Sequence, residues 1–192
     1  MKSRDLLLEA SDHLNYEVWM LRLTSYRLAK VADSSPAEHG ALLHAVTHTS
    51  HVEVSIYSSN APITAPSEDE EQVARVNADI ESFAIHLRAL LDFFYMPPEK
   101  ARSDDILAEH FFADPQLWRE ARPQLSEQEL AAIRERVGKE IAHLTYRRLF
   151  LTEPEKLWPF IDLKRTALDA LEAFLENVDH SLLSERWRIQ SA

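Results

Sequence analysis

Residues 67–95 read SEDEEQVARVNADIESFAIHLRALLDFFY. Apolar residues recur in this stretch at intervals of three and four, the spacing that places them on one face of an α-helix: Val73, Val76, Ile80, Phe83, Leu87, Leu90 and Phe94. Ser67 followed by Glu70 is a capping-box pattern, in which each side chain bonds the free backbone N–H of the other residue. The stretch therefore predicts one long amphipathic helix over 68–95.

The same two signals, a capping residue and a helical apolar stripe, mark further helices along the chain. We expect long helices at 4–31, 36–60, 68–95, 127–150 and 155–179, and short ones at 104–112 and 115–121. The proline-containing linkers between them have lengths typical of connections between antiparallel neighbours. No convincing strand pattern occurs. We therefore predict an all-α, up-and-down helical bundle that forms a single domain over 1–192.

Glycine and cysteine usage excludes several kinds of site. The chain has only two glycines, Gly40 and Gly138, and no cysteine. Phosphate-binding loops need several glycines at fixed spacing, and thiolate zinc sites and cysteine nucleophiles need cysteine, so we expect no nucleotide loop and no cofactor. Gly138 lies inside an expected helix, where glycine costs about 1 kcal/mol relative to alanine. Close approach of another helix, within the subunit or across a dimer, is the reason that we expect for it.

The charge balance and the N-terminal sequence bear on partners and location. The net charge is −11, which argues against broad binding to DNA or RNA because phosphate neutralisation drives such binding. A small basic pocket on an acidic body stays compatible with it. Met1 to Ala10 does not resemble a signal peptide, and no apolar run approaches the roughly 20 residues that span a bilayer. We therefore expect a cytoplasmic protein that does not enter membranes.

Two residues with useful chemistry, Arg136 and His143, are seven positions apart and so share one face of the helix expected at 127–150. A guanidinium holds a phosphate, and an imidazole transfers protons near neutral pH. Together they suit cleavage of RNA by its own 2′-hydroxyl without a metal. Glu140 and Arg147 lie on the same strip, and a simple ion pair between Arg136 and Glu140 is the structural alternative.

Residues 136–146, RVGKEIAHLTY, resemble the motif helix of the HEPN superfamily (higher eukaryotes and prokaryotes nucleotide-binding domains). Members of that superfamily are all-α bundles with the pattern Arg-x4–6-His on a late helix. The resemblance covers the motif helix well and the preceding helices more loosely. It implies that Arg136 and His143 are the motif pair. Glu140, Tyr146 and Arg147, which lie nearby in the sequence, are candidates to support that pair.

Active members of the superfamily are metal-independent ribonucleases, often in defence or toxin systems, and they dimerise so that two motifs form one site. The resemblance therefore implies a homodimer that is either an RNA-cleaving enzyme or a catalytically inactive module that binds RNA or a nucleotide. Arg136 would bind the scissile phosphate, and His143 would act as general acid or base. Active members often carry Asn, Asp or His directly after the arginine, whereas this chain has Val137 on the apolar stripe.

Two other functions fit the sequence. His44, His48 and His51 share a helical face, which lets histidines chelate a divalent metal if another helix supplies a further ligand; a solvated flank is the alternative. The other function is a non-enzymatic assembly protein that binds a protein partner through an apolar helix face. His86, at the edge of the stripe in 68–95, is either a boundary histidine or a support for the motif pair, if the two helices pack together.

Overall fold

The computed structural model describes residues 2–34, 67–138 and 159–188. These residues form six α-helices: α1 (Arg4–Ser34), α3 (Glu68–Tyr95), α4 (Pro115–Ala121), α5 (Glu127–Arg136), α7 (Phe160–Asn177) and α8 (Glu185–Arg188). No strand occurs in these three ranges. The prediction of an all-α helical bundle is therefore confirmed, while the helix predicted at 36–60 lies outside the described residues.

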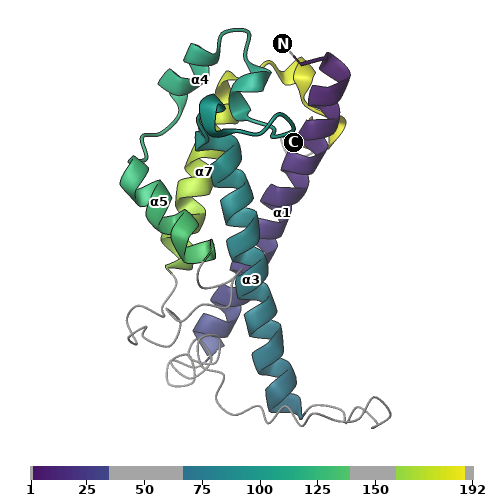
Figure 1. The fold of residues 1–192 in the computed structure, drawn as a ribbon. Helices are drawn as coiled ribbons and strands as arrows, with labels where there is room; N and C mark the ends of the chain where they lie inside the picture. The colour runs from purple at the N-terminus through teal and green to yellow at the C-terminus, as the bar shows by residue number, and fades with distance from the viewer. Residues whose placement is uncertain (1, 35–66, 139–158, 189–192) are drawn as a thin grey trace, which may run out of the picture.

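The two longest helices, α1 and α3, form the central pair of the bundle. α1 runs away from the N-terminus and α3 returns beside it (Figure 1). Apolar residues that recur at helical spacing in the sequence are buried on both helices: Leu7, Leu14, Val18, Leu21 and Leu28 on α1, and Val76, Ile80, Phe83, Leu87, Leu90 and Phe94 on α3. Burial of such side chains is the main force that holds the pair together, at about 25 cal/mol per Å² of apolar area.

Phe174 of α7 lies at the centre of an aromatic cluster that joins the long helices to residues 108–121. Its ring centroid lies 5.4 to 6.1 Å from those of five aromatic residues: Phe93, Phe94, Phe111, Phe112 and Trp118. Most of these contacts are edge-to-face, a geometry that aromatic pairs prefer. The indole N–H of Trp118 donates a hydrogen bond to the backbone carbonyl of Phe94 at 3.0 Å. The cluster is therefore part of the hydrophobic core, and the buried indole N–H of Trp118 has a hydrogen-bond partner.

Residues 104–112, predicted as a short helix, contain only a 3₁₀ turn at Ala108–Phe111. The residues on either side, Leu107 and Phe112, have extended backbones, with ψ of 149° and 139°. Both side chains are buried. Their burial anchors each end of the turn to the core, so the turn does not extend into a longer helix. The neighbouring prediction was right, since α4 spans the whole of 115–121.

The end of the chain also differs from the prediction. The described part of the helix predicted at 155–179 begins only at Phe160, after Pro159, because proline lacks the N–H that an internal helix position needs. α8 was not predicted, since four residues are too few to show a period. It is fixed to α1 by Trp187, whose indole N–H donates to the carbonyl of Ser11 at 2.9 Å.

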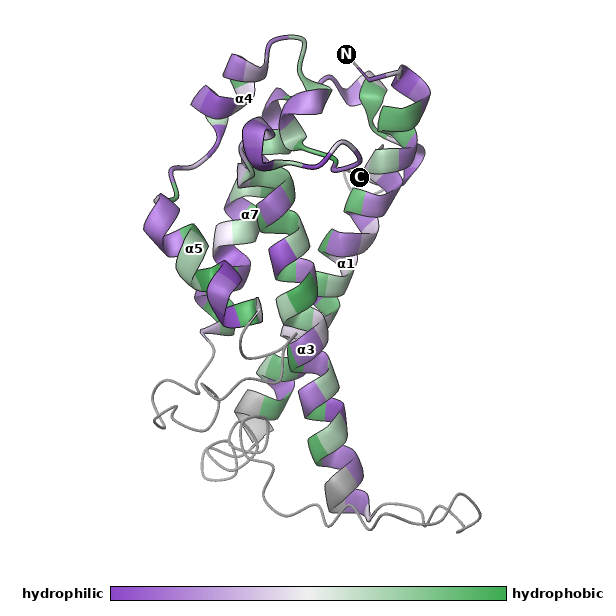
Figure 2. Cartoon of the chain, viewed as in Figure 1, coloured by the Kyte–Doolittle hydropathy of each residue, from purple (hydrophilic) through white to green (hydrophobic). Residues whose placement is uncertain are grey.

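Apolar and polar residues alternate around every long helix (Figure 2), so each helix presents one apolar face to the others. Within the described ranges, no helix combines the length and the apolar character that crossing a membrane requires.

The position of Phe174 in the aromatic cluster predicts how its substitution changes the free energy of unfolding. Phe174→Ala removes a ring that is 0% exposed, and we expect it to lower the free energy of unfolding by about 3–5 kcal/mol. Ile161→Ala, on the same helix but 65% exposed, is the matched control and should change it by less than about 0.5 kcal/mol. Urea unfolding followed by circular dichroism measures both. Equal effects of the two substitutions would contradict the assignment of Phe174 to the core.

Candidate functional site

α5 is the described part of the helix that carries Arg136, and its start is fixed by the predicted capping box. The Ser126 hydroxyl accepts the backbone N–H of Glu129 at 3.2 Å, and the Glu129 carboxylate accepts that of Ser126 at 3.0 Å. The Ser126 hydroxyl and backbone N–H together hold the pKa of the Glu129 carboxyl below its usual value. This start lies about three turns before Arg136.

Val137, the residue after Arg136, fixes the rotation of α5 against α3. It is 1% exposed and packs with Ala84 of α3, which is 0% exposed. Ile133, Phe160 and Leu163 close around this pair. The backbone at Val137 keeps helical angles, with φ of −57° and ψ of −47°. The position after Arg136 is therefore a core position.

A group of charged side chains joins α5 to α3 beside this apolar contact. Arg134 Nε donates to Asp92 Oδ1 at 2.6 Å, and Arg88 Nε lies 3.6 Å from Asp92 Oδ2. The Asp92 side chain is 23% exposed and that of Arg134 is 26% exposed. Charge-assisted bonds in such partly covered places are stronger than those between neutral groups. The Arg134–Asp92 pair and the Val137–Ala84 contact together hold the end of α5 in one orientation.

Arg136 is half-buried, between the exposed Glu135 and the buried Val137. One residue turns a helix by about 100°, so the burial of Val137 places Arg136 at the edge of the contact between α5 and α3. The other strip residues, Glu140, His143, Tyr146 and Arg147, lie outside the described residues.

His86 is placed against α1. Its Nδ1 lies 2.6 Å from Glu17 Oε2, and its side chain is 12% exposed. Its ring also meets Tyr16 edge-on, with centroids 5.6 Å apart. His86 is two positions from Ala84, about 200° around α3, so the two residues face different neighbours. The helices α3 and α5 do pack together. However, α3 contacts this part of the chain through Ala84 and Asp92, and it contacts α1 through His86.

The histidines proposed for a metal site, His44, His48 and His51, lie outside the described residues. Within the described part of the chain, no three His, Asp or Glu side chains are grouped so that they could hold a metal ion.

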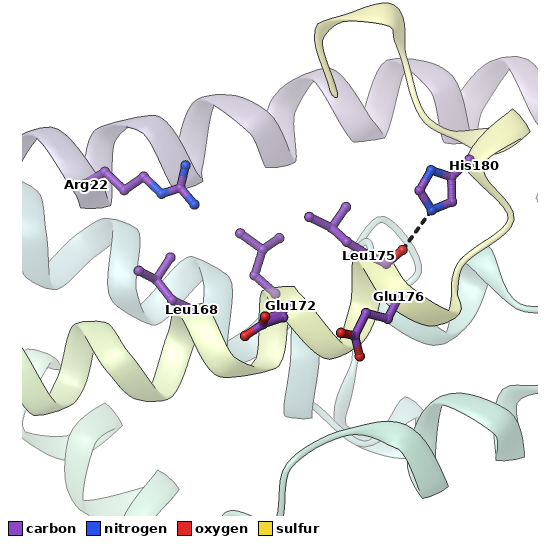
Figure 3. Close-up of a pocket in the computed structure, with 7 residues that line it drawn as sticks. Arg22, Leu168, Glu172, Leu175, Glu176 and His180 are labelled. Atoms are coloured by element: carbon purple, nitrogen blue, oxygen red, sulfur yellow. Dashed lines mark hydrogen bonds between the residues drawn. The ribbon is translucent and has the colours of Figure 1, made fainter. Parts of the chain in front are cut away.

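A groove of about 700 Å³ lies between α1 and α7 (Figure 3). Leu168, Leu171 and Leu175 contribute its apolar lining, and Arg22, Glu172 and Glu176 its charged lining. At one end the His180 Nε2–H donates to the carbonyl of Leu175 at 2.8 Å. The groove holds both signs of charge, so its lining does not select one class of ligand.

One surface of the structure, the outer face of α1, was not predicted from the sequence. Tyr16, Trp19 and Tyr26 are all about half exposed there. They are three and seven positions apart, which is helical spacing, and this stripe lies opposite the leucines that fill the core. The sequence signal that could have predicted this surface is the helical spacing of these aromatic residues on the side of the helix away from its leucines.

The close approach of a helix that was expected at Gly138 is not found within this chain, while an approach across a dimer stays a prediction. A Cβ built on Gly138 meets no atom within 4 Å, so no neighbouring helix requires glycine. We predict that Gly138→Ala raises the free energy of unfolding by about 0.5–1 kcal/mol, because alanine loses less backbone entropy on folding. The control is Ala132→Gly, exposed on α5, which should lower it by about 1 kcal/mol. A loss of stability in Gly138→Ala, measured by urea unfolding, would reveal a close neighbour such as a second subunit.

Comparison of the chain with models of known protein families, with curated proteins and with solved structures gave no match. The proposed function therefore rests on this chain's own residues and on the resemblance in residues 136–146.

Proposed function

We propose that this chain is a HEPN-like domain that binds RNA and cleaves it without a metal ion. Arg136 binds the scissile phosphate, and His143 is the general acid or base. The observation that carries the proposal is the burial of Val137 against Ala84. That contact supports the proposal because it fixes the rotation of α5, with Arg136 next to the buried Val137 and itself half-buried. The all-α bundle is compatible with the superfamily.

The chemistry needs few groups. The 2′-oxygen attacks phosphorus and the bond to the 5′-oxygen breaks, so the products carry a 2′,3′-cyclic phosphate and a 5′-hydroxyl. One proton leaves the attacking hydroxyl and one reaches the departing oxygen, which calls for a base and an acid. Arg136 stabilises the negative charge that develops on the phosphate oxygens. Each chain supplies one His143, so a homodimer supplies the two proton-transfer groups.

The core position of Val137 also limits what the site contains. Because Val137 is apolar and buried, no polar side chain directly follows Arg136. Arg136 and His143 therefore act without such a group. The net charge of −11 restricts RNA contacts to local clusters of basic side chains. A nuclease of this kind, with few contacts and no metal requirement, suits a defence or toxin system in the cytoplasm.

Cleavage of a mixed pool of single-stranded and transfer RNA, with EDTA present, tests this function. We expect the wild-type protein to produce 2′,3′-cyclic phosphate ends. His143→Ala and Arg136→Ala should each lower the rate by about 100-fold or more, as loss of an acid–base or charge-stabilising group does.

Arg165→Ala is the matched control, because it removes an exposed arginine of α7, distant in the chain from the motif. It should cleave at the wild-type rate. Circular dichroism checks that all variants stay helical. Wild-type rates in both motif variants would refute the assigned roles, and no cleavage by the wild-type protein would leave a binding or assembly role.

A further inference from the structure

The outer face of α1 carries a regular row of side chains, which we call the outer seam. Its members follow one another at alternating intervals of four and three residues: Asp12, Tyr16, Trp19, Leu23, Tyr26 and Lys30. This is the spacing by which one helix meets another in a coiled coil. The three rings are 49%, 54% and 57% exposed. Aromatic side chains of this size normally bury much of their area, so packing within the described residues does not account for the outer seam.

Two of the rings are held in place before any partner binds. Tyr16 and Trp19 have centroids 6.2 Å apart. Tyr16 also meets His86 edge-on, at 5.6 Å and 81°, and His86 Nδ1 lies 2.6 Å from Glu17 Oε2. These contacts link the middle of the outer seam to α3. Side chains that are exposed and already oriented lose little entropy when they form an interface.

The two ends of the outer seam carry opposite charges. Asp12 lies at one end, where its side chain is 42% exposed and 3.7 Å from the exposed Arg186. Lys30 lies at the other end, with its Nζ 4.8 Å from the centroid of the Tyr26 ring. Nearby charged residues have charged neighbours within the chain: Glu17 has His86, Arg27 has Asp79, and Arg22 lines the same groove as Glu172 and Glu176. The outer seam therefore favours a partner of mixed charge over a polyanion.

The outer seam is complementary to itself when two copies run antiparallel. Its residues form three pairs whose members are equally far along the chain from Leu21: Asp12 with Lys30, Tyr16 with Tyr26, and Trp19 with Leu23. In a contact with twofold symmetry, residue i of one copy meets residue j of the other, and j meets i. Opposite charges then meet at both ends of the contact, while aromatic and apolar side chains meet between them.

The charges also set the direction and the length of the contact. A parallel pair of helices would place Asp12 against its own copy and Lys30 against its own copy, and such juxtaposition of like charges is unfavourable. The next pair outward in the antiparallel arrangement, Glu9 and Asp33, carries like charges. The contact therefore ends at Asp12 and Lys30, which are about 27 Å apart along the helix. One helix face of this length belongs among the small, reversible interfaces.

We propose that two copies of this chain associate through the outer seam of α1, as an antiparallel pair of helices. The inference goes beyond the proposed function, because the seam lies on α1 whereas the end of α5 packs on α3 through Val137 and Ala84. The association does not depend on the chemistry at Arg136, so the two are tested separately.

Sedimentation velocity over a range of protein concentrations, without RNA, tests the inference. We expect a reversible equilibrium between monomer and dimer. Trp19→Ala should raise the Kd of the dimer by about tenfold or more, because a tryptophan near the centre of a contact often carries much of the binding energy. The matched control is Leu117→Ala on α4, where the side chain is also 54% exposed; it should associate as wild type. Circular dichroism checks that the variants stay helical.

Exchange of the end charges tests the antiparallel direction. Asp12→Lys and Lys30→Asp each place like charges opposite one another at both ends of the contact, so each variant alone should associate about tenfold more weakly. An equimolar mixture of the two variants should associate as wild type, because opposite charges meet again in the mixed pair. A parallel pair would not be weakened by either substitution alone, since its like charges already face each other.

Three results would overturn the inference. The first is a wild-type protein that stays monomeric up to about 100 μM, a concentration that populates weak dimers. The second is a dimer that Trp19→Ala leaves unchanged, which would assign self-association to another face. The third is failure of the mixed charge variants to associate. A dimer that depends on Trp19, in a protein that does not cleave RNA, would support this inference while refuting the nuclease.

Discussion

Burial of α3 on several sides is the constraint on which the rest of the structure depends. From Val76 to Tyr95 nearly every third or fourth side chain is buried, and different sectors of the helix meet different neighbours. Phe83 meets Phe160 of α7 at 5.1 Å, Ala84 meets Val137 next to α5, and His86 meets Glu17 of α1. The helix therefore sets the rotation of each neighbour that packs on it.

This arrangement has consequences for function on both sides of α3. On the α5 side, the pairing of Val137 with Ala84 and of Arg134 with Asp92 decides that Arg136 emerges at an edge. On the α1 side, the bond between His86 and Glu17 supports Tyr16 and with it the exposed aromatic stripe. One scaffold helix thus orients both the end of α5 and the exposed aromatic residues of α1.

Local signals predicted most of the described helices. Capping residues and apolar spacing predicted the starts of α3, α4 and α5, because these signals act within one turn. The turn at Ala108–Phe111 and the late start of α7 were predicted wrongly. The burial of Leu107 and Phe112 on either side of that turn is decided by tertiary packing, which local pattern does not contain.

The candidate site was predictable only in part. The spacing of Arg136 and His143 is readable from the sequence, and so is the apolar character of Val137. Ala84 contacts Val137, whereas His86 contacts Glu17. These contacts depend on the order in which the neighbouring helices lie around α3, which the spacing of residues does not give. The position of Gly138, with open space where a Cβ would be, is likewise a property of packing and not of spacing.

Ultraviolet crosslinking of the intact protein to RNA, followed by mass spectrometry of the crosslinked peptides, tests the central claim most directly. The claim is that RNA meets the helix that carries Arg136. We predict crosslinks in the peptides that contain Arg136 to His143. Crosslinks confined to other segments, such as α4 or the end of α7, would contradict the account.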